Sequence, residues 1–152
     1  MNASSKVQQA TVSKSVPGVG LLDSLAPHAH WALRLALGSV FLYHGLTKFP
    51  ALGPMSEMMG MPIALLTLVA IAEAAGGALV LIGGFTHDLL TRLGALSLVP
   101  VMLGAIAMVH WGRWSFTPAE GYPMGGMEFQ VTLILVSLYL FIKGNNVGRA
   151  SA

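Results

Sequence analysis

An imidazole and an ammonium group lie one helical turn apart at the end of an apolar segment, in the sequence LYHGLTKF that covers residues 42–49. His44 and Lys48 would share one stripe of a helix, because residues four positions apart lie on the same face. A carboxyl group, Glu73, lies in the middle of a second apolar segment. Bases close to a buried acid can exchange protons with a bound ligand. These residues are the first candidates for a functional site.

A second group of polar residues flanks the loop between two later apolar segments. His110 and Arg113 end one segment and Glu128 begins the next, with three aromatic residues, Trp111, Trp114 and Phe116, between them. We expect these aromatic residues to cover one polar pocket that has apolar walls. Such a pocket suits a quinone, whose carbonyl oxygens accept hydrogen bonds and whose reduction takes up protons. The candidate cofactor-binding residues are His44, Lys48, Glu73, His110, Arg113 and Glu128.

The same residues also have explanations that involve no function. A histidine at a helix C-terminus and a glutamate in a first turn are favoured by the helix dipole alone. Glu73 could instead be a hydrogen-bonded lock between two helices. Haem ligation is a minor alternative, because His44 and His110 would have to face each other across the iron. No metal site is expected: the chain has no cysteine, and its nine methionines are scattered enough to fill space rather than bind copper.

The composition indicates an integral membrane protein. Of 152 residues, 55% are hydrophobic and only 9% are charged, whereas a soluble domain has roughly 25% charged residues. So few charges cannot cover a globular surface with solvated groups, and the lipid bilayer is therefore the expected surrounding. The excess of basic residues, 8 against 6 acidic ones, is too small for a nucleic-acid surface.

Four apolar segments approach the ~20 residues that a helix needs to cross a bilayer. The sequence therefore predicts an all-α fold, an integral membrane four-helix bundle over residues 28–145. A flexible cytoplasmic tail over residues 1–27, with a short interfacial helix at LLDSL, precedes it, and a C-terminal tail over 146–152 follows. One face of the second segment, which includes Glu73, is expected to face the bundle interior. The expected spans are residues 31–49, 63–83, 89–109 and 127–143.

The distribution of positive charge predicts the orientation. With four spans both termini lie on one side, and that side collects Lys6, Lys14, Arg34, Arg92, Lys143 and Arg149, against Lys48 and Arg113 on the other. Positive charge marks the cytoplasmic side, so both termini are expected in the cytoplasm and the protein in the inner (plasma) membrane. Arg34 and Arg92 are interpreted as topology residues, with Arg34 extending its side chain to the headgroups.

Depth in the bilayer suggests a partner for Glu73. A carboxylate near the midplane costs at least about 2.5–3.5 kcal/mol, so Glu73 should be neutral or paired. At a rise of 1.5 Å per residue, His44 lies within roughly 5 Å of the same depth, and Arg34 about 10 Å away. We expect His44 to be the partner, with Arg34 as the rival.

Several of these residues occur in a pattern that resembles a known family. The sequence RLALGSVFLYHGLTKF resembles the signature of the DoxX family of small four-helix membrane proteins, and EAAGGALVLIGG and GGMEF agree with it. The resemblance covers roughly residues 30–145, whereas the tail GNNVGRASA departs from the family pattern. Its recurrent polar positions fall on Arg34, His44, Lys48, Glu73, His110 and Glu128.

The resemblance implies a redox setting linked to quinone. The family's named member is similar to the membrane subunit of an archaeal thiosulfate:quinone oxidoreductase, and other relatives are membrane partners of soluble redox enzymes. We therefore expect a quinone-associated subunit or accessory that passes electrons from a partner enzyme to the quinone pool. It would not be catalytic alone, because the chain has no cysteine for an iron–sulfur cluster and no Gly-rich dinucleotide motif.

Two other functions stay open. The first is a non-catalytic structural or assembly subunit, or an anchor, of a larger membrane complex, in which the polar residues serve helix packing. The second is a proton or small-solute pathway through Glu73. Apart from Arg34, the expected cytoplasmic half of the bundle is apolar, and the sequence therefore supplies only half of such a pathway.

Overall fold

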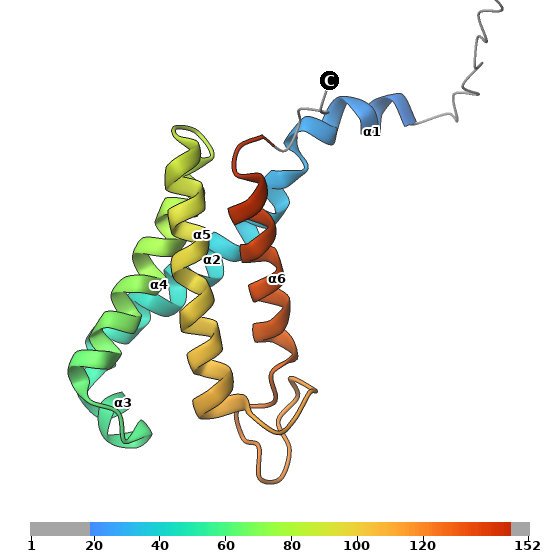
Figure 1. Ribbon diagram of the computed structural model, residues 1–152. Helices are drawn as coiled ribbons and strands as arrows, with labels where there is room; N and C mark the ends of the chain where they lie inside the picture. The colour runs from blue at the N-terminus through green and yellow to red at the C-terminus, as the bar shows by residue number, and fades with distance from the viewer. Residues whose placement is uncertain (1–18, 147–152) are drawn as a thin grey trace, which may run out of the picture.

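The computed structural model describes residues 19–146, and almost all regular structure in that range is helical (Figure 1). The all-α class expected from the sequence is confirmed, and an isolated bridge between Ala119 and Tyr122 is the one β-type pairing in this range. The helices are α1 (Val19–Leu25), α2 (His30–Lys48), α3 (Leu52–Met59), α4 (Ile63–Gly83), α5 (Asp88–Ala105) and α6 (Glu128–Lys143).

The tails expected from the sequence fall largely outside the described residues. Residues 1–18 and 147–152 are not described. Of the N-terminal tail expected to be flexible over 1–27, the part Val19–Leu25 is helical and contains the LLDSL segment.

Proline and glycine set several of the helix ends. Pro62 directly precedes α4 in an extended conformation, with φ −55° and ψ 132°, and proline fits this place because a first-turn N–H has no partner within the helix. Gly60 ends α3 with φ 60°, a left-handed conformation that glycine adopts without strain. A π-helical turn, Ile106–His110, continues α5. That irregular turn was not expected from the sequence.

The four long helices pack in the order α2, α4, α5, α6, and α6 contacts α2 only sparsely. Small residues bring the helix backbones close together. A Cβ atom on Gly77 would lie 2.7 Å from the backbone nitrogen of Leu42, and one on Gly94 would lie 2.8 Å from the carbonyl oxygen of Gly76. Glycine at these positions therefore sets the close contact of α4 with α2 and with α5.

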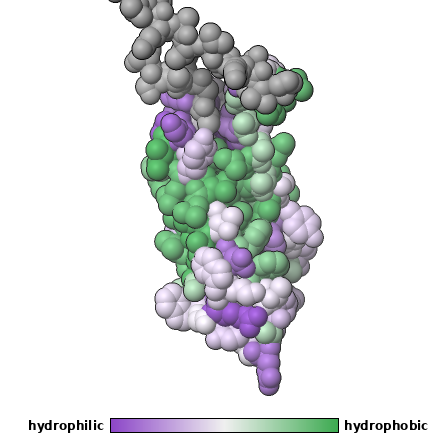
Figure 2. All heavy atoms as spheres, turned by 90° about the vertical axis from the view of Figure 1, so that its right-hand side faces the viewer, coloured by the Kyte–Doolittle hydropathy of each residue, from purple (hydrophilic) through white to green (hydrophobic). Residues whose placement is uncertain are grey.

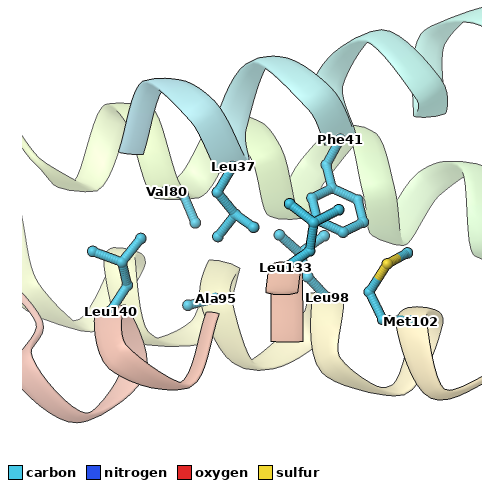
Figure 3. Close-up of a cluster of buried hydrophobic side chains, with 8 residues drawn as sticks. All are labelled: Leu37, Phe41, Val80, Ala95, Leu98, Met102, Leu133 and Leu140. Atoms are coloured by element: carbon cyan, nitrogen blue, oxygen red, sulfur yellow. The ribbon is translucent and has the colours of Figure 1, made fainter. Parts of the chain in front are cut away.

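All four long helices contribute side chains to one apolar core (Figure 3). The face of α4 expected to point inward comprises Ala70, Glu73, Gly77, Val80 and Gly84. The first four are buried, whereas Gly84, directly after the helix, is half-buried. The core is a layer in the middle of the bundle, with polar clusters on either side of it. The core residues are Leu37, Phe41, Val80, Ala95, Leu98, Met102, Leu133 and Leu140.

The outside of the bundle is apolar around its middle. Figure 2 shows hydrophobic side chains over the central part and hydrophilic ones toward both ends. Large apolar side chains such as Leu68, Leu103 and Leu135 are exposed there. Two helical stretches of the described chain, Ile63–Gly83 and Asp88–His110, are long and apolar enough to cross a membrane. This surface is that of a membrane protein, because lipid can cover apolar side chains that water cannot.

Candidate functional site

Charged side chains are buried or half-buried at two levels of the bundle. One group lies at the end where α2 begins and α6 ends, which we call the terminal end. It comprises Arg34, Asp88, Thr91, Arg92 and Asn145 and is called the terminal cluster below. The second is the ion pair between Lys48 and Glu73, which lies toward the opposite end, where residues 111–127 form a loop (the loop end).

Arg34 is the centre of the terminal cluster and is fully buried, at 0% exposure. Its Nη1 donates to the carbonyl oxygen of Val80 (2.9 Å) and to Thr91 Oγ1 (2.8 Å). Its Nη2 donates to the carbonyl oxygen of Gly144 (3.1 Å) and to Asn145 Oδ1 (2.8 Å). The Nε–H donates to His30 Nδ1 at 3.0 Å, so all five N–H groups of the guanidinium are used. The expectation that Arg34 extends to the headgroups is therefore wrong.

Asp88 and Asn145 extend this network to the first turn of α5 and the end of α6. The backbone N–H of Asn145 donates to Asp88 Oδ1 at 2.5 Å, and its side-chain Nδ2 donates to the carbonyl oxygen of Gly83 at 2.9 Å. Arg92 pairs with Asp88 Oδ2 at 2.6 Å and donates to the carbonyl oxygens of Phe141 (2.7 Å) and Ile142 (2.9 Å). Arg92 thus satisfies carbonyl groups that the end of α6 leaves unpaired.

The Lys48–Glu73 pair joins the end of α2 to the middle of α4. Lys48 Nζ donates to Glu73 Oε2, and it also approaches the carbonyl oxygen of His44 at 3.4 Å. Glu73 is 5% exposed. The acid is therefore paired as expected, but its partner is neither His44 nor Arg34.

The depth estimate was right, but the face of α2 was not considered. A Cβ atom on Gly45 would lie 2.8 Å from the carbonyl oxygen of Ala70 and closer still to the backbone nitrogen of Ala74, so Glu73 lies level with Gly45 and His44. The His44 side chain is exposed, however, whereas Lys48, one turn further along α2, is half-buried and reaches back to Glu73. Arg34 is held by the terminal cluster instead.

His44 lies on the exposed side of α2. Its ring packs edge-on against Tyr43, with centroids 5.7 Å apart. Across residues 19–146 no hydrogen bond of its side chain is found. His44, a candidate binding residue, therefore makes no hydrogen bond with Glu73.

His110, Arg113 and Glu128 organise the 111–127 loop. His110 Nδ1 lies 3.1 Å from the carbonyl oxygen of Gly125, which can only accept, so Nδ1 carries the proton. The carbonyl oxygen of Arg113 accepts from the N–H of Met127 at 2.9 Å, and Glu128 Oε2 accepts from the N–H of Phe116 at 3.3 Å. These contacts fold the two ends of the loop against each other.

The six candidate residues therefore do not share one hydrogen-bonded pocket. Within the described part of the chain, no hydrogen bond or ion pair joins the loop residues to Lys48 or Glu73. The aromatic residues expected to cover the pocket are exposed, with 71% for Trp111, 57% for Trp114 and 60% for Phe116. They lie on the outside of the loop.

Sequence reasoning missed the network of the terminal cluster, although Arg34 and Arg92 were named as topology residues. Asp88 and Arg92 are four positions apart at a helix start, and this spacing was a usable signal for their ion pair. Thr91 and Asn145 gave no comparable signal. Their roles depend on contacts between residues more than fifty positions apart in the chain.

The Lys48–Glu73 pair keeps capacity for a further hydrogen bond. An ammonium group has three N–H donors, and two are used by Glu73 and by the His44 carbonyl group. Glu73 Oε1 has no hydrogen-bond partner among the described residues. It is not fully buried, unlike the unpaired side-chain oxygens of Gln130 and Ser137, so part of its surface is accessible. The pair can therefore donate to, accept from and exchange a proton with a small polar molecule. No group of His, Cys, Asp or Glu in the described chain is arranged to hold a metal ion.

Comparisons with known proteins complete the description of the site. The profile of the family described as DoxX matches residues 29–111, which include Arg34, Lys48 and Glu73. A protein of Bacillus subtilis (strain 168) named "Putative oxidoreductase CatD" is 29% identical over 116 residues, covering 74% of this chain and 77% of that protein. No solved structure matches the chain.

Proposed function

The chain belongs to the DoxX family, and we propose that it is a membrane redox subunit that binds quinone at the Lys48–Glu73 pair. In this role it serves as an accessory through which a partner enzyme delivers electrons to the quinone pool. The similarity to a relative whose name includes oxidoreductase supports the redox setting. The partner supplies the electron carrier, because the chain has no cysteine that could bind an iron–sulfur cluster.

The observation that carries this proposal is the buried, incompletely satisfied ion pair. Quinone reduction takes up two electrons and two protons per ring. Lys48 has a free N–H that can donate to a ring carbonyl, and the open Oε1 of Glu73 can exchange a proton with the ring oxygen. Both groups lie among apolar helices, where a hydrogen bond to a bound ligand is stronger than in water.

The proposed topology has four membrane crossings with both termini in the cytoplasm, in the inner (plasma) membrane. Helix α2 has 19 residues and is about 28 Å long at 1.5 Å per residue, which is close to the thickness of the hydrocarbon core. The excess of basic residues on the side of the termini supports the orientation. The Lys48–Glu73 pair would then lie in the outer half of the membrane.

Single cysteines can test this orientation, because the chain has none of its own. A membrane-impermeant maleimide should label Glu120→Cys, in the 111–127 loop, on intact cells. The same reagent should label Ser5→Cys only after the cells are opened. The reverse pattern would contradict the orientation.

Quinone binding is tested with the purified protein in lipid nanodiscs and ubiquinone-1 as the ligand. Glu73→Gln removes the ionisable group with little change in shape and should weaken binding about tenfold, the effect of losing a hydrogen bond to a charged group. Glu57→Gln, at an exposed glutamate of α3, is the matched control and should bind as the wild type does. Equal affinity of Glu73→Gln and the wild type would refute the site.

A structural subunit is the second candidate function, and the terminal cluster favours it. There the protein's own groups saturate the guanidinium of Arg34, which is what helix packing requires. If this alone is the role, Glu73→Gln would change the yield of the complex with its partner enzyme. Turnover per assembled complex would then stay the same.

A further inference from the structure

Gln130 carries a buried polar atom that the protein itself does not satisfy. Its Oε1 is enclosed and has no hydrogen-bond partner within residues 19–146, a state it shares with Ser137 Oγ. A buried acceptor without a partner costs about 1–3 kcal/mol. A serine hydroxyl can turn to the carbonyl group of the preceding helical turn, but a glutamine amide at this position has no such local partner. The unpaired amide oxygen of Gln130 therefore indicates that a hydrogen-bonding group from outside the chain binds here.

Gln130 lies on the face of α6 that points into the bundle. It precedes Leu133 by three positions, and Leu133, Ser137 and Leu140 are the buried residues of this helix. Leu133 and Phe41 belong to the same core cluster (Figure 3). One turn further toward the loop end, antiparallel α2 reaches Gly45 and α6 reaches Gln130. Gln130 is therefore at the level of Gly45.

Glu73 lies at this level as well. Gly45 packs against the backbone of α4 at Ala70 and Ala74, and these residues flank Glu73 in the sequence. Glu73 is buried on the inner face of α4. The carboxyl group from α4 and the amide from α6 thus face the bundle interior in one layer, on opposite sides. The core residues Phe41 and Met102 lie next to this layer.

Both polar groups border accessible space at one atom. Neither Glu73 Oε1 nor Gln130 Nε2 has a hydrogen-bond partner among the described residues, and neither is an enclosed atom. The seam between α2 and α6 is the least closely packed of the four sides of the bundle. A ligand dissolved in the bilayer could enter there.

We infer that Gln130 and the Lys48–Glu73 pair bind the two opposite oxygen atoms of one quinone ring, with Gln130 as a positioning residue. This inference rests on the proposed function and adds its second contact. The amide Nε2–H donates to one ring carbonyl, and Lys48 donates to the other. After reduction this ring oxygen becomes a hydroxyl donor, and a half-turn of the amide brings Oε1, the atom left unsatisfied, to it. An amide suits this place because it both donates and accepts.

The test uses Gln130→Met in the full-length protein in lipid nanodiscs. Methionine keeps the length and flexibility of the side chain and removes both the donor and the acceptor. The dissociation constant for ubiquinone-1 should rise about three- to tenfold, the effect of one neutral hydrogen bond. Ser137→Ala changes the other unsatisfied residue of α6 two turns away. It should leave the affinity unchanged.

The side-chain amide of Gln130 can be observed directly by NMR, because the chain has only two other glutamines, Gln8 and Gln9. With 15N-glutamine labelling, the side-chain amide signal that is lost in Gln130→Met identifies Gln130. Addition of ubiquinone-1 should shift this signal in the wild-type protein. The shift should be reduced in Glu73→Gln at the same ligand concentration, because less ligand is bound.

Each outcome decides between the two proposals. If Glu73→Gln weakens binding while Gln130→Met binds normally and the amide signal does not move, Gln130 is not a contact, and the proposed function stands without it. If Gln130→Met raises the stability and leaves the affinity unchanged, the amide is an unsatisfied buried group that does not contact the ligand, and the inference is wrong. Equal losses in Ser137→Ala and Gln130→Met would indicate general packing and also overturn it. Failure of the wild-type protein to bind ubiquinone-1 would refute both proposals.

Discussion

At the terminal end the guanidinium of Arg34 is buried and donates only to neutral acceptors, whereas toward the loop end an ammonium and a carboxylate pair with each other. Arg34 uses all five of its N–H donors on groups of the protein. Lys48 and Glu73 each retain one hydrogen-bonding position after they pair. The two regions therefore differ in how many hydrogen-bonding positions their charged groups leave free.

This difference separates a structural role from a functional one. A charge whose donors are all satisfied internally can bind nothing further without first breaking a contact. A pair with a free donor and an open acceptor can bind a ligand at no such cost. Mutations at the two regions should therefore separate stability from ligand binding.

The largest loss of stability is expected at the centre of the terminal cluster. Arg34→Met leaves the carbonyl oxygens of Val80 and Gly144 and the side chains of Thr91 and Asn145 without their donor. At about 1–3 kcal/mol for each unsatisfied buried group, the free energy of unfolding should fall by more than about 3 kcal/mol. Unfolding of bicelle-embedded protein by dodecyl sulfate, followed by tryptophan fluorescence, measures it.

Arg34→Lys sharpens this prediction, because it keeps the charge and removes the fork of donors. Lysine has three N–H groups in place of five, so the loss should lie between those of the wild type and of Arg34→Met. Arg113→Met is the control, since the guanidinium of Arg113 makes one long hydrogen bond, 3.4 Å to the carbonyl oxygen of Ser115. A control as unstable as Arg34→Met would mean that the terminal cluster has no special role.

The next largest loss of stability is expected at the Lys48–Glu73 pair, and a second mutation should restore most of it. Lys48→Met leaves the carboxylate of Glu73 buried without its partner, which should cost about 3 kcal/mol. The double variant Lys48→Met with Glu73→Gln removes both charges and should recover most of that stability. Ubiquinone-1 binding should stay weak in the double variant. Recovery of both stability and binding would make the pair dispensable for the proposed function.

Asn145 should give an intermediate loss of stability and no loss of binding. Asn145→Ala removes acceptors for Arg34 and Thr91 and a donor to Gly83, with an expected cost of about 2 kcal/mol. The adjacent Asn146 is exposed, and Asn146→Ala should be neutral, which makes it a matched control. Ubiquinone-1 titration of both variants should give the wild-type affinity. Weaker binding by Asn145→Ala alone would show that the two ends are coupled.

Helix positions were largely predictable from the sequence, because apolar run length and flanking proline and glycine are local signals. The segment expected over 63–83 is α4, and the one expected over 127–143 is α6 with one residue fewer at its start. The burial of Glu73 on the inner face of α4 was also predictable, from helical periodicity. The π-helical turn Ile106–His110 carried no such local pattern.

The partners of the buried charges were not predictable, since they depend on how each helix is turned about its own axis. Glu73 lies at the level of Gly45 and His44, but the His44 side chain is exposed, and Lys48 reaches back along α2 to the carboxylate instead. Asn145 meets Arg34 because the chain turns directly after α6, at Gly144, which has φ 57°. The departure of the C-terminal tail from the family pattern left Asn145 without an assigned role.

The smallest effect is expected for His44, whose mutation tests whether the geometry or the sequence pattern gives the better guide to the site. Its side chain is exposed, and Lys48 contacts only its backbone carbonyl group, at 3.4 Å. His44→Ala keeps that carbonyl group, so the free energy of unfolding should change by less than about 0.5 kcal/mol. Ubiquinone-1 affinity should also stay within twofold of the wild type. A tenfold loss of affinity with unchanged stability would place the imidazole in contact with the ligand, and the ring would then have to approach from the exposed side of α2 rather than through the seam beside Gln130.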